Sequence, residues 1–407
     1  MAENSSSAQM VASSDDLLIE IIQRLPFNTF AQLRLVSNYW NSLMLDPKLG
    51  LSHNRPALGL IFEGLDIGHE TPSSYIIFLD KSITPPIRNM IPPKVDTFYR
   101  HCKILHSCNG LLLCVSKRDG PKYYVFNPTT RKHIQLPDVV FDHSRVSIRG
   151  MYLAFDPSKS PHYKVVCVMR SFAERLHLFE VYSSETRSWR KGGDLFKADF
   201  DCEDGVHLNG ANYEDGVYWN GANFEDGVYW NRAIHWVNIS IKPQGSTCFT
   251  KPPREPVYFS LDCDQTPKVF PKPPLQNKPY YKNDYYFGES CDHLHFIDAH
   301  RTSNKLVVYE MKRDYSEWFV KYNVNVGFGE WYIRHEFTDT SRRYIVVRGK
   351  NDEDSFLVVA TGQRIVRYNF ELKTCEILYE FKPKFEDRPV SWGAKRPFQY
   401  IQSLCPV

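Results

Sequence analysis

Short apolar segments rich in Val, Ile, Tyr, Phe and Trp fill most of this chain of 407 residues, and they constrain its fold more than any other feature. Short runs of such residues bounded by turn formers predict β-strands. Turn dipeptides such as Asn109-Gly110 and Asn127-Pro128 separate the runs. No long helical pattern interrupts them after residue 55, so alternating strand and helix units are excluded and a mainly β fold is expected. The predicted strands include 58–62, 75–79, 110–115, 123–126, 163–169, 176–182, 233–239, 293–297, 306–311, 344–347, 356–360 and 364–368.

Several of these strands end in a similar phrase, in which a Tyr or Phe precedes a polar turn that contains Thr. The phrase occupies residues 123–130, 182–189 and 368–374. Recurrence at intervals of roughly 40 to 60 residues is typical of β-propeller blades. About six or seven blades fit the length of the chain.

Residues 13–54 differ from the rest, because their apolar residues recur at helical spacing. Ser13 begins a capping-box pattern, and Pro26 ends the first predicted helix. Asn28 and Ser37 are positioned to cap a second and a third helix. The apolar positions of the three helices are Leu17, Leu18, Ile21, Ile22, Leu25, Phe30, Leu33, Val36, Trp40, Leu43 and Met44. Helices this short cannot bury enough apolar surface to be stable alone, so we expect a partner to cover the rest.

A tandem repeat of eleven residues occupies residues 203–235. Its units read EDGVHLNGANY, EDGVYWNGANF and EDGVYWNRAIH. An odd period would alternate the faces of a continuous strand, so each unit is expected to turn at its Asn-Gly pair. We expect one copy in the sheet. A local duplication that loops out is favoured over a ligand-binding array, because three units are too few for an independent solenoid. Trp219 and Trp230 are the residues to follow.

The N-terminal phrases DDLLIEIIQRLP and VSNYW resemble the F-box, the motif that docks onto a Skp-family adaptor within a cullin-based ubiquitin ligase. The resemblance covers residues 13 to about 50. Two departures from the family pattern, Ser13-Ser14 in place of Leu-Pro and Asn38 in place of Lys, would weaken adaptor binding. By this resemblance, the positions that fold the motif or contact the adaptor are Leu17, Leu18, Ile21, Leu25, Pro26, Leu33, Val36 and Trp40.

The remaining chain resembles the F-box-associated domain of plant F-box proteins, a form related to kelch-type propellers. Phrases that carry the resemblance include SCNGLLLC, VFNPTTRKHIQLP, LFEVYSSETRSWR and GVYWNRAIHWV. In such phrases a Trp or a Leu-Pro fills the space between blades. The family has Asn-Gly where this chain has Asn231-Arg232, so we expect the repeat to disturb that hairpin. The predicted domains are a disordered segment at 1–12, the F-box at 13–54 and the propeller at 55–407.

No catalytic motif for a phosphate loop, a nucleophile elbow or a zincin helix occurs in the sequence, so we predict no catalytic residues, no cofactor and no metal site. Cys291, His293 and His295 alternate, which on one strand would place all three on one face. Buried core residues are the commoner meaning of this spacing. The acidic loop near Asp201 lacks the glycine and glutamate of a calcium loop.

Composition limits the partners and the compartment. A net charge of +3 gives no strong field, so neither nucleic acid nor a membrane surface is an expected partner. Ten scattered cysteines without C-x-x-C pairs, and no signal peptide or long apolar run, predict reduced thiols in the cytoplasm or nucleus.

The resemblance implies a function as the substrate-recognition subunit of an SCF-type (Skp, cullin, F-box) E3 ubiquitin ligase, a non-catalytic receptor that binds an adaptor and an unidentified protein substrate. We expect substrate to contact the acidic repeat loop and the Pro-rich segment 251–279, since propellers bind through loops at one end. The alternative is a glycan- or small-molecule-binding propeller with a degenerate F-box.

Overall fold

The structure is a computed structural model of the whole chain. It describes residues 9–23, 36–44, 56–65, 73–83, 87–89, 102–116, 120–139, 146–171, 176–196, 227–237, 255–262, 266–275, 285–299, 305–325, 343–349, 351–361, 364–380, 397–403 and 405–407.

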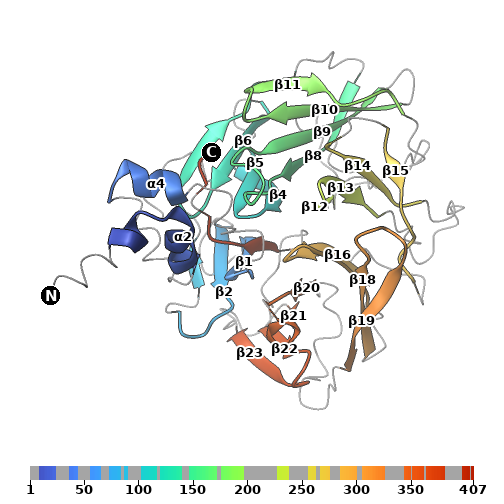
Figure 1. Ribbon diagram of the computed structural model, residues 1–407. Helices are drawn as coiled ribbons and strands as arrows, with labels where there is room; N and C mark the ends of the chain where they lie inside the picture. Colours follow the sequence, from blue (N-terminus) through green and yellow to red (C-terminus); the bar gives the residue numbers. More distant parts are fainter. Residues whose placement is uncertain are drawn as a thin grey trace, which may run out of the picture.

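Six four-stranded antiparallel sheets are arranged around a central axis as the blades of a β-propeller (Figure 1). This confirms the mainly β prediction and sets the blade number at six. Blade 1 contains β24 (Phe398–Tyr400), β1 (Gly59–Leu65), β2 (Ser73–Phe78) and β3 (Ile87–Asn89). Blade 2 contains β4 (Cys102–Cys108), β5 (Leu111–Ser116), β6 (Lys122–Asn127) and β7 (Lys132–Gln135), and blade 3 contains β8 (Val146–Ala154), β9 (Lys164–Ser171), β10 (His177–Ser183) and β11 (Ser188–Lys191).

The other three blades follow in chain order. Blade 4 contains β12 (Val228–Trp230), β13 (Ala233–Trp236), β14 (Val257–Ser260) and β15 (Lys268–Val269). Blade 5 contains β16 (Tyr285–Ser290), β17 (His293–Asp298), β18 (Lys305–Met311) and β19 (Trp318–Asn325). Blade 6 contains β20 (Arg343–Val347), β21 (Phe356–Ala360), β22 (Arg364–Asn369) and β23 (Cys375–Glu380), with a 3-10 turn at Asp352–Asp354.

The two ends of the propeller are joined within blade 1. The C-terminal strand β24 pairs with β1, with Gly59 opposite Tyr400 and Ile61 opposite Phe398. In addition, the N–H of Leu58 donates to the carbonyl of Tyr400 at 2.9 Å. The ring is thus closed by hydrogen bonds between segments more than 300 residues apart in sequence. Such closure leaves no open sheet edge between the first and last blades.

The core lies between neighbouring sheets rather than on one side of them. All six residues of β5 are buried, because each blade is covered on both faces. Leu113 and Val125 of blade 2, for example, pack in one cluster with Met151 and Val165 of blade 3. Val- and Ile-rich strands suit this environment, since their branched side chains fill a pleated surface.

The recurring Tyr/Phe and Thr phrase forms the same turn in three blades. In each, a residue in the left-handed region ends the turn between the third and fourth strands: Arg131 (φ 58°), Arg187 (φ 54°) and Lys373 (φ 54°). Its N–H donates to the carbonyl four residues earlier, at 2.8–3.0 Å. The sequence interpretation of these phrases as blade repeats is therefore confirmed.

Tryptophans link neighbouring blades, as the sequence phrases predicted. The indole N–H of Trp189 at the start of β11 donates to the carbonyl of Pro137 after β7, at 2.8 Å. Trp318 on β19 makes the equivalent bond to the carbonyl of Pro271 after β15, at 2.9 Å. Leu136 is buried beside the first of these contacts. Each bond joins the outer part of one blade to the end of the preceding one.

The N-terminal helices α2 (Asp15–Gln23) and α4 (Asn38–Met44) confirm the helical prediction for this region. Ser37 caps α4, because its Oγ accepts the N–H of Trp40 at 3.2 Å. At α2 the prediction was wrong by one residue: Ser14 precedes the helix, and its Oγ lies 3.5 Å from the N–H of Leu17. The second predicted helix lies outside the described residues.

A short helical turn at residues 9–12 precedes α2, so the predicted disordered segment 1–12 is wrong in its last four residues. The N–H of Ser13 donates to the carbonyl of Gln9, and the Oγ of Ser13 donates to that of Met10, both at 3.0 Å. These bonds satisfy carbonyls at the end of the turn. Among the described residues, no helix has the length and apolar character needed to cross a membrane.

The third copy of the tandem repeat forms the hairpin of β12 and β13 in blade 4. Its turn residues Asn231 (φ 46°) and Arg232 (φ 62°) both have positive φ, as a two-residue type I′ turn requires. The expectation that Arg232 in place of Gly would disturb this hairpin is therefore wrong. Arg232 tolerates the conformation while its guanidinium pairs with Asp262 at 2.5 Å. The first two copies, with Trp219, lie outside the described residues.

Candidate functional site

The N-terminal helices expose large apolar side chains of a kind that is usually buried in a folded domain. Leu17 and Ile21 on α2 are 45% and 48% exposed, and Val36 before α4 is 64% exposed. Leu18, the next residue on α2, is only 7% exposed. Among the predicted adaptor-binding residues, Leu17, Ile21 and Val36 are therefore accessible to a partner, whereas Leu18 is buried and packs within the chain.

The remaining predicted adaptor residues fall into two groups. Trp40 is half-buried on α4. Leu25, Pro26 and Leu33 lie outside the described residues. Sequence reasoning missed Tyr39, which is 45% exposed beside Trp40.

Tyr39 also connects the two helices. Its hydroxyl donates to Asp15 Oδ1 at the start of α2, at 2.5 Å. This hydrogen bond to a carboxylate raises the pKa of Tyr39. The phrase V-S-x-Y-W contained the signal for this residue, because a tyrosine next to the motif tryptophan projects from the same short helix. The bond holds the starts of α2 and α4 together.

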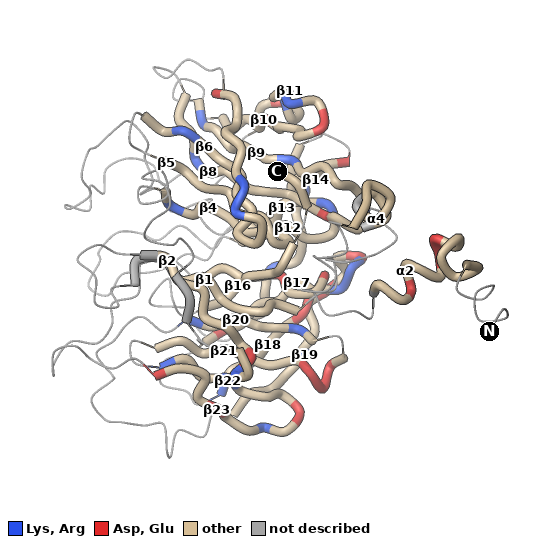
Figure 2. The backbone as a smooth tube through the Cα atoms, turned by 90° about the vertical axis from the view of Figure 1, so that its left-hand side faces the viewer, with Lys and Arg blue, Asp and Glu red and all other residues tan. Residues whose placement is uncertain are grey.

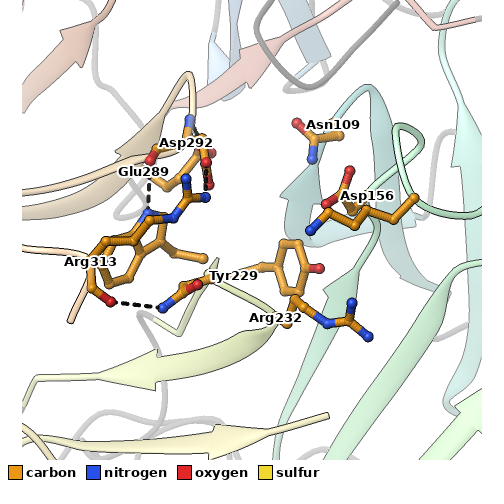
Figure 3. Close-up of a pocket in the computed structure, with 10 residues that line it drawn as sticks. Asn109, Asp156, Tyr229, Arg232, Glu289, Asp292 and Arg313 are labelled. Carbon is orange, nitrogen blue, oxygen red and sulfur yellow. Dashed lines mark hydrogen bonds and ion pairs between the residues drawn. The ribbon is translucent and has the colours of Figure 1, made fainter. Parts of the chain in front are cut away.

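The propeller presents a second candidate surface on one face of the ring, which we call the turn face. The turns that leave the innermost strands lie there, since these strands run in the same direction in every blade. They bring Asn109, Asp156, Arg232 and Asp292 around one small hollow of about 30 Å³ (Figure 3). The hydroxyl of Tyr229 lies among them. The strand β1 also begins at this face, so the chain from the N-terminal helices enters here.

A larger hollow of about 680 Å³ adjoins the first and lies over blade 5. Trp230, Asp292 and Arg313 line both hollows. The indole N–H of Trp230 donates to the carbonyl of Asp292 at 2.9 Å, and the guanidinium of Arg313 pairs with the Asp292 carboxylate. The volume is within the range of ligand sites, about 300–1,000 Å³.

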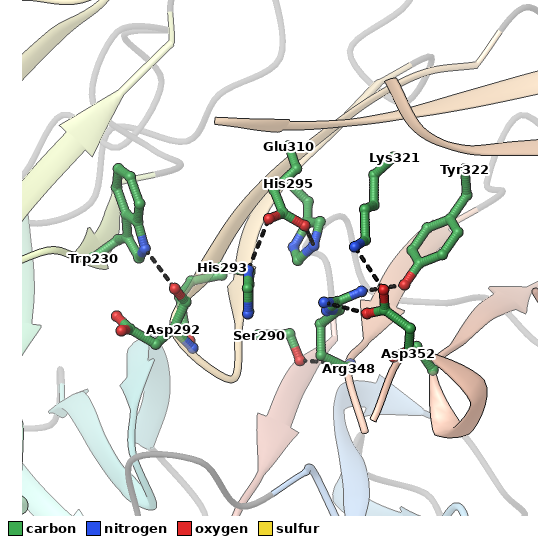
Figure 4. A network of polar contacts seen from close by, with 12 residues as sticks. Trp230, Ser290, Asp292, His293, His295, Glu310, Lys321, Tyr322, Arg348 and Asp352 are labelled. Carbon is green, nitrogen blue, oxygen red and sulfur yellow. Dashed lines mark hydrogen bonds and ion pairs between the residues drawn. The ribbon is translucent and has the colours of Figure 1, made fainter. Parts of the chain in front are cut away.

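Glu310 on β18 is the centre of a polar network in this hollow (Figure 4). Its Oε1 lies 2.8 Å from His293 Nδ1, and its Oε2 lies 3.5 Å from His295 Nε2. Burial alone would raise the pKa of Glu310, but the contacts with the two imidazoles lower it below its usual range. An ionised carboxylate only accepts, so His293 Nδ1 carries the proton.

Arg348, which follows β20, forms the other half of the network (Figure 4). Its guanidinium pairs with Asp352 at 2.7 Å and donates to the hydroxyl of Tyr322. Its backbone N–H donates to Ser290 Oγ at 3.0 Å. Lys321 also reaches Asp352, at 2.8 Å. These bonds tie blade 6 to blade 5 behind the hollow.

The structure does not place Cys291, His293 and His295 on one strand face. Cys291 lies in the β16–β17 turn with a φ of 49°, and β17 begins only at His293. The thiol of Cys291 donates to the carbonyl of Arg348 at 3.2 Å. Burial raises the pKa of this thiol to about 12, so it stays protonated. Within the described residues, no group of three metal-ligating side chains is brought together.

Of the two loops predicted to contact substrate, the first two copies of the repeat lie outside the described residues. The Pro-rich segment is described at 255–262 and 266–275 and contributes β14 and β15 to blade 4, so the expectation that it is a loop is wrong for these residues. The repeat segment connects β11 to β12, and the Pro-rich segment begins before β14 and ends before β16. By the antiparallel order of the strands, these connections start and end at the face opposite the turn face. The role proposed for them stays a prediction.

Comparison with known proteins gives two domain matches. Residues 14–52 match the F-box domain, and residues 74–226 match the F-box associated beta propeller domain. F-box protein At5g07610 of Arabidopsis thaliana is 30% identical over 99% of this chain and 94% of its own length. F-box protein At5g49610 of the same plant is 28% identical over 44% of this chain and 50% of its own. Among solved structures, a chain of the nidogen/laminin complex aligns with a TM-score of 0.37 at 8% identity, over 80% of this chain and 93% of that one.

Proposed function

This chain belongs to the plant F-box proteins that carry an F-box-associated β-propeller domain, and from that premise we propose that it is the substrate-recognition subunit of an SCF-type E3 ubiquitin ligase. In this function the N-terminal helices bind a Skp-family adaptor, and through it a cullin. The propeller binds a target protein for ubiquitination. The chain itself catalyses no step, and it needs neither a cofactor, nor nucleic acid, nor a membrane.

The exposed apolar surface of α2 and α4 is the observation that carries the proposal. Leu17 and Ile21 on α2, Tyr39 on α4 and Val36 just before α4 are each 45% or more exposed. Burying a side chain of this size contributes about 1.5–3 kcal/mol, so a partner helix pair gains from covering them. The propeller is complete without these residues, because its ring closes through β24 and β1. The helices are therefore free to serve an external partner.

The mechanism of such a receptor is proximity. Holding a target protein on the propeller, near a conjugating enzyme held by the cullin, raises the effective concentration of a target lysine. The reaction is then effectively intramolecular, and the receptor contributes geometry. The cysteines among the described residues are free thiols, which supports a location in the reducing cytoplasm or nucleus.

Co-purification of the full chain with a Skp-family adaptor tests this function. The variant Leu17→Asp with Ile21→Asp places two charges on the exposed surface and is expected to abolish adaptor binding, because each charge would be desolvated in the interface. The control is Leu372→Asp, which changes a 70% exposed leucine on the propeller and should leave binding intact.

Circular dichroism of both variants verifies that they stay folded. An adaptor that does not bind the parent chain, or that binds the double variant equally well, would contradict the proposal. In the first case the departures at Ser13-Ser14 and Asn38 would have removed the adaptor contact. The propeller would then act as a free-standing binding module.

A further inference from the structure

The exposed apolar surface of the N-terminal helices is divided between two elements. Leu17 and Ile21 lie one turn apart on α2, whereas Tyr39 lies on α4 and Val36 just before it. The two helices lie side by side (Figure 1), although residues 24–37 separate them in sequence. A partner that covers both parts must order them relative to each other, and that ordering costs binding free energy unless the chain has already achieved it.

A hydrogen bond between two side chains joins these helices. The hydroxyl of Tyr39 donates to Asp15 Oδ1 at 2.5 Å, across 24 residues of sequence. Asp15 is the first residue of α2, and Tyr39 is the second residue of α4. A hydrogen bond to a carboxylate is shorter and stronger than one between neutral groups. The bond therefore sets the start of α4 against the start of α2.

The backbone on the α4 side of this bond is itself held in a capped turn. Ser42 Oγ donates to the carbonyl of Tyr39 at 2.9 Å, and Ser37 Oγ accepts the N–H of Trp40 at 3.2 Å. The ring of Tyr39 meets the ring of Trp40 edge to face, with centroids 6.4 Å apart. Tyr39 is therefore fixed on α4, so its bond to Asp15 orients the whole helix.

The start of α2 gains much less from its own cap. The N–H of Leu17 lies 3.5 Å from Ser14 Oγ, which is longer than an ordinary N–H···O hydrogen bond. Asp15 in the first turn is well placed to interact with the helix dipole, and its carboxylate is the group that Tyr39 contacts. The contact with α4 thus supports the end of α2 that is least supported from within.

The hydroxyl and the ring of Tyr39 serve different purposes. The hydroxyl is engaged within the chain, while 45% of the residue remains exposed. The hydrogen bond with Asp15 also raises the pKa of Tyr39, so the hydroxyl keeps its proton at neutral pH. Removing the hydroxyl alone would leave the apolar area of the ring in place, which makes the two purposes separable by experiment.

We propose that Tyr39 is a positioning residue for adaptor binding, whose bond to Asp15 holds α2 and α4 in the relative position in which one adaptor surface covers both. This role rests on the proposed function, because it concerns the same adaptor surface. The apparent dissociation constant rises in inverse proportion to the fraction of molecules that hold the binding position. A chain in which only about one molecule in five holds it would bind about fivefold more weakly.

The kinetics of adaptor binding test this role. The full chain is immobilised for biolayer interferometry, and a purified plant Skp-family adaptor is the analyte. Tyr39→Phe keeps the ring and removes the hydroxyl, so it should weaken affinity about fivefold through slower association, because fewer molecules hold the binding position. A loss of affinity that comes from faster dissociation alone would mean that the hydroxyl contacts the adaptor, and it would overturn the positioning role.

Variants of Asp15 separate the hydrogen bond from the charge. Asp15→Ala removes the acceptor and should reproduce the slower association of Tyr39→Phe. Asp15→Asn keeps a carbonyl oxygen for the hydroxyl and should bind within about twofold of the parent chain. Combining Tyr39→Phe with Asp15→Ala should weaken binding no more than either change alone, because both remove the same bond. Effects that multiply in the double variant would show that the two residues act independently.

The matched control is Tyr124→Phe on blade 2, which removes a hydroxyl that donates to Gln135 Oε1 at 3.2 Å and should bind the adaptor like the parent chain. Circular dichroism verifies that all variants stay folded. A parent chain that does not bind the adaptor would remove the ligase function together with this role. A parent chain that binds, with Tyr39→Phe binding equally well, would remove this role alone, so the two failures are distinguishable.

Discussion

The N-terminal helices and the propeller treat apolar residues in opposite ways. Five large apolar side chains are exposed between residues 10 and 39 alone, namely Met10, Leu17, Ile21, Val36 and Tyr39. In the described blades only Leu195, Val269, Val320 and Leu372 are exposed to a similar degree. The propeller closes on its own C-terminal strand, whereas the helices leave apolar side chains exposed. The charged residues of the described N-terminal helices, Asp15, Asp16 and Glu20, are all acidic, whereas basic and acidic residues are interspersed over the blades (Figure 2).

The largest difference in stability between the propeller and the helices should appear at acidic pH. His177, His235 and His295 are buried in the propeller, and burial lowers their pKa values to about 4, about 3 and about 4. In the unfolded chain they would titrate near 6.5. Below that pH the unfolded state binds protons that the folded state does not, so stability is lost as the pH falls from about 6.5 toward 4. The first histidine of the chain is His53, so the helices lack this sensitivity.

Urea denaturation at a series of pH values measures the effect. Each of the three histidines should contribute up to about 1.4 kcal/mol per pH unit within the window. His235→Gln should reduce the slope by one proton, while His162→Gln, which removes an exposed imidazole, should leave it unchanged. A free energy of unfolding that stays constant from pH 6.5 to 4.5 would show that the imidazoles are not buried as neutral groups.

Truncation of a buried side chain tests the same contrast between the two regions at neutral pH. Leu113 on β5 is fully buried between blades 2 and 3. Leu113→Ala should lower the free energy of unfolding by about 2–5 kcal/mol, because it leaves a cavity in a packed cluster. Leu17→Ala removes the same atoms from an exposed site, so it should change the free energy of unfolding by no more than about 0.5 kcal/mol. Equal costs in thermal or urea unfolding would mean that α2 is covered within the chain itself.

Residues after β24 also hold the ring closed, because Ser403 and Cys405 are hydrogen-bonded to blade 2. Asn127 is fully buried, and its Nδ2 donates to the carbonyls of Ser403 and Cys405 at 3.0 and 2.9 Å. Its Oδ1 accepts the N–H of Thr129. Asn127→Asp keeps that acceptor and removes both donors, so it should cost about 1–3 kcal/mol of stability.

Asn369 provides the matched control, because it occupies the same kind of turn in blade 6. Its Oδ1 accepts the N–H groups of Glu371 and Leu372. Asn369→Asp retains these bonds and should be nearly neutral in urea unfolding. If both variants cost the same, the C-terminal residues would not fasten blade 2.

Local patterns predicted the elements, but not what distant elements bring together. The phrases at 123–130 and 368–374 specified a turn, because the hydrogen bonds that close it join residues only four apart in sequence, Arg131 to Asn127 and Lys373 to Asn369. The adjoining hollows on the turn face combine Asp156, which follows β8, with Glu289 on β16 and Glu310 on β18, and no spacing along the chain indicates that these residues lie near one another. Cys291 does not share a strand face with His293 and His295 for a local reason: a period of two assumes a continuous strand, and the turn at Cys291 and Asp292 interrupts it. Arg232 shows the converse, since a turn forms without the glycine that usually marks it.

The smallest predicted effect lies within the N-terminal helices. Ser37 Oγ accepts the N–H of Trp40 at the start of α4, and loss of such a cap costs about 1 kcal/mol. Ser37→Ala should therefore increase hydrogen exchange of the α4 amides about fivefold while exchange in the blades stays constant. Ser37→Asp restores an acceptor and should restore protection, because a carboxylate is also favoured at a helix N-terminus. Binding of the adaptor should suppress the difference between Ser37→Ala and the parent chain, since a helix covered by a partner no longer depends on its own cap. Persistent fast exchange of α4 in the complex would show that the adaptor contacts α2 alone.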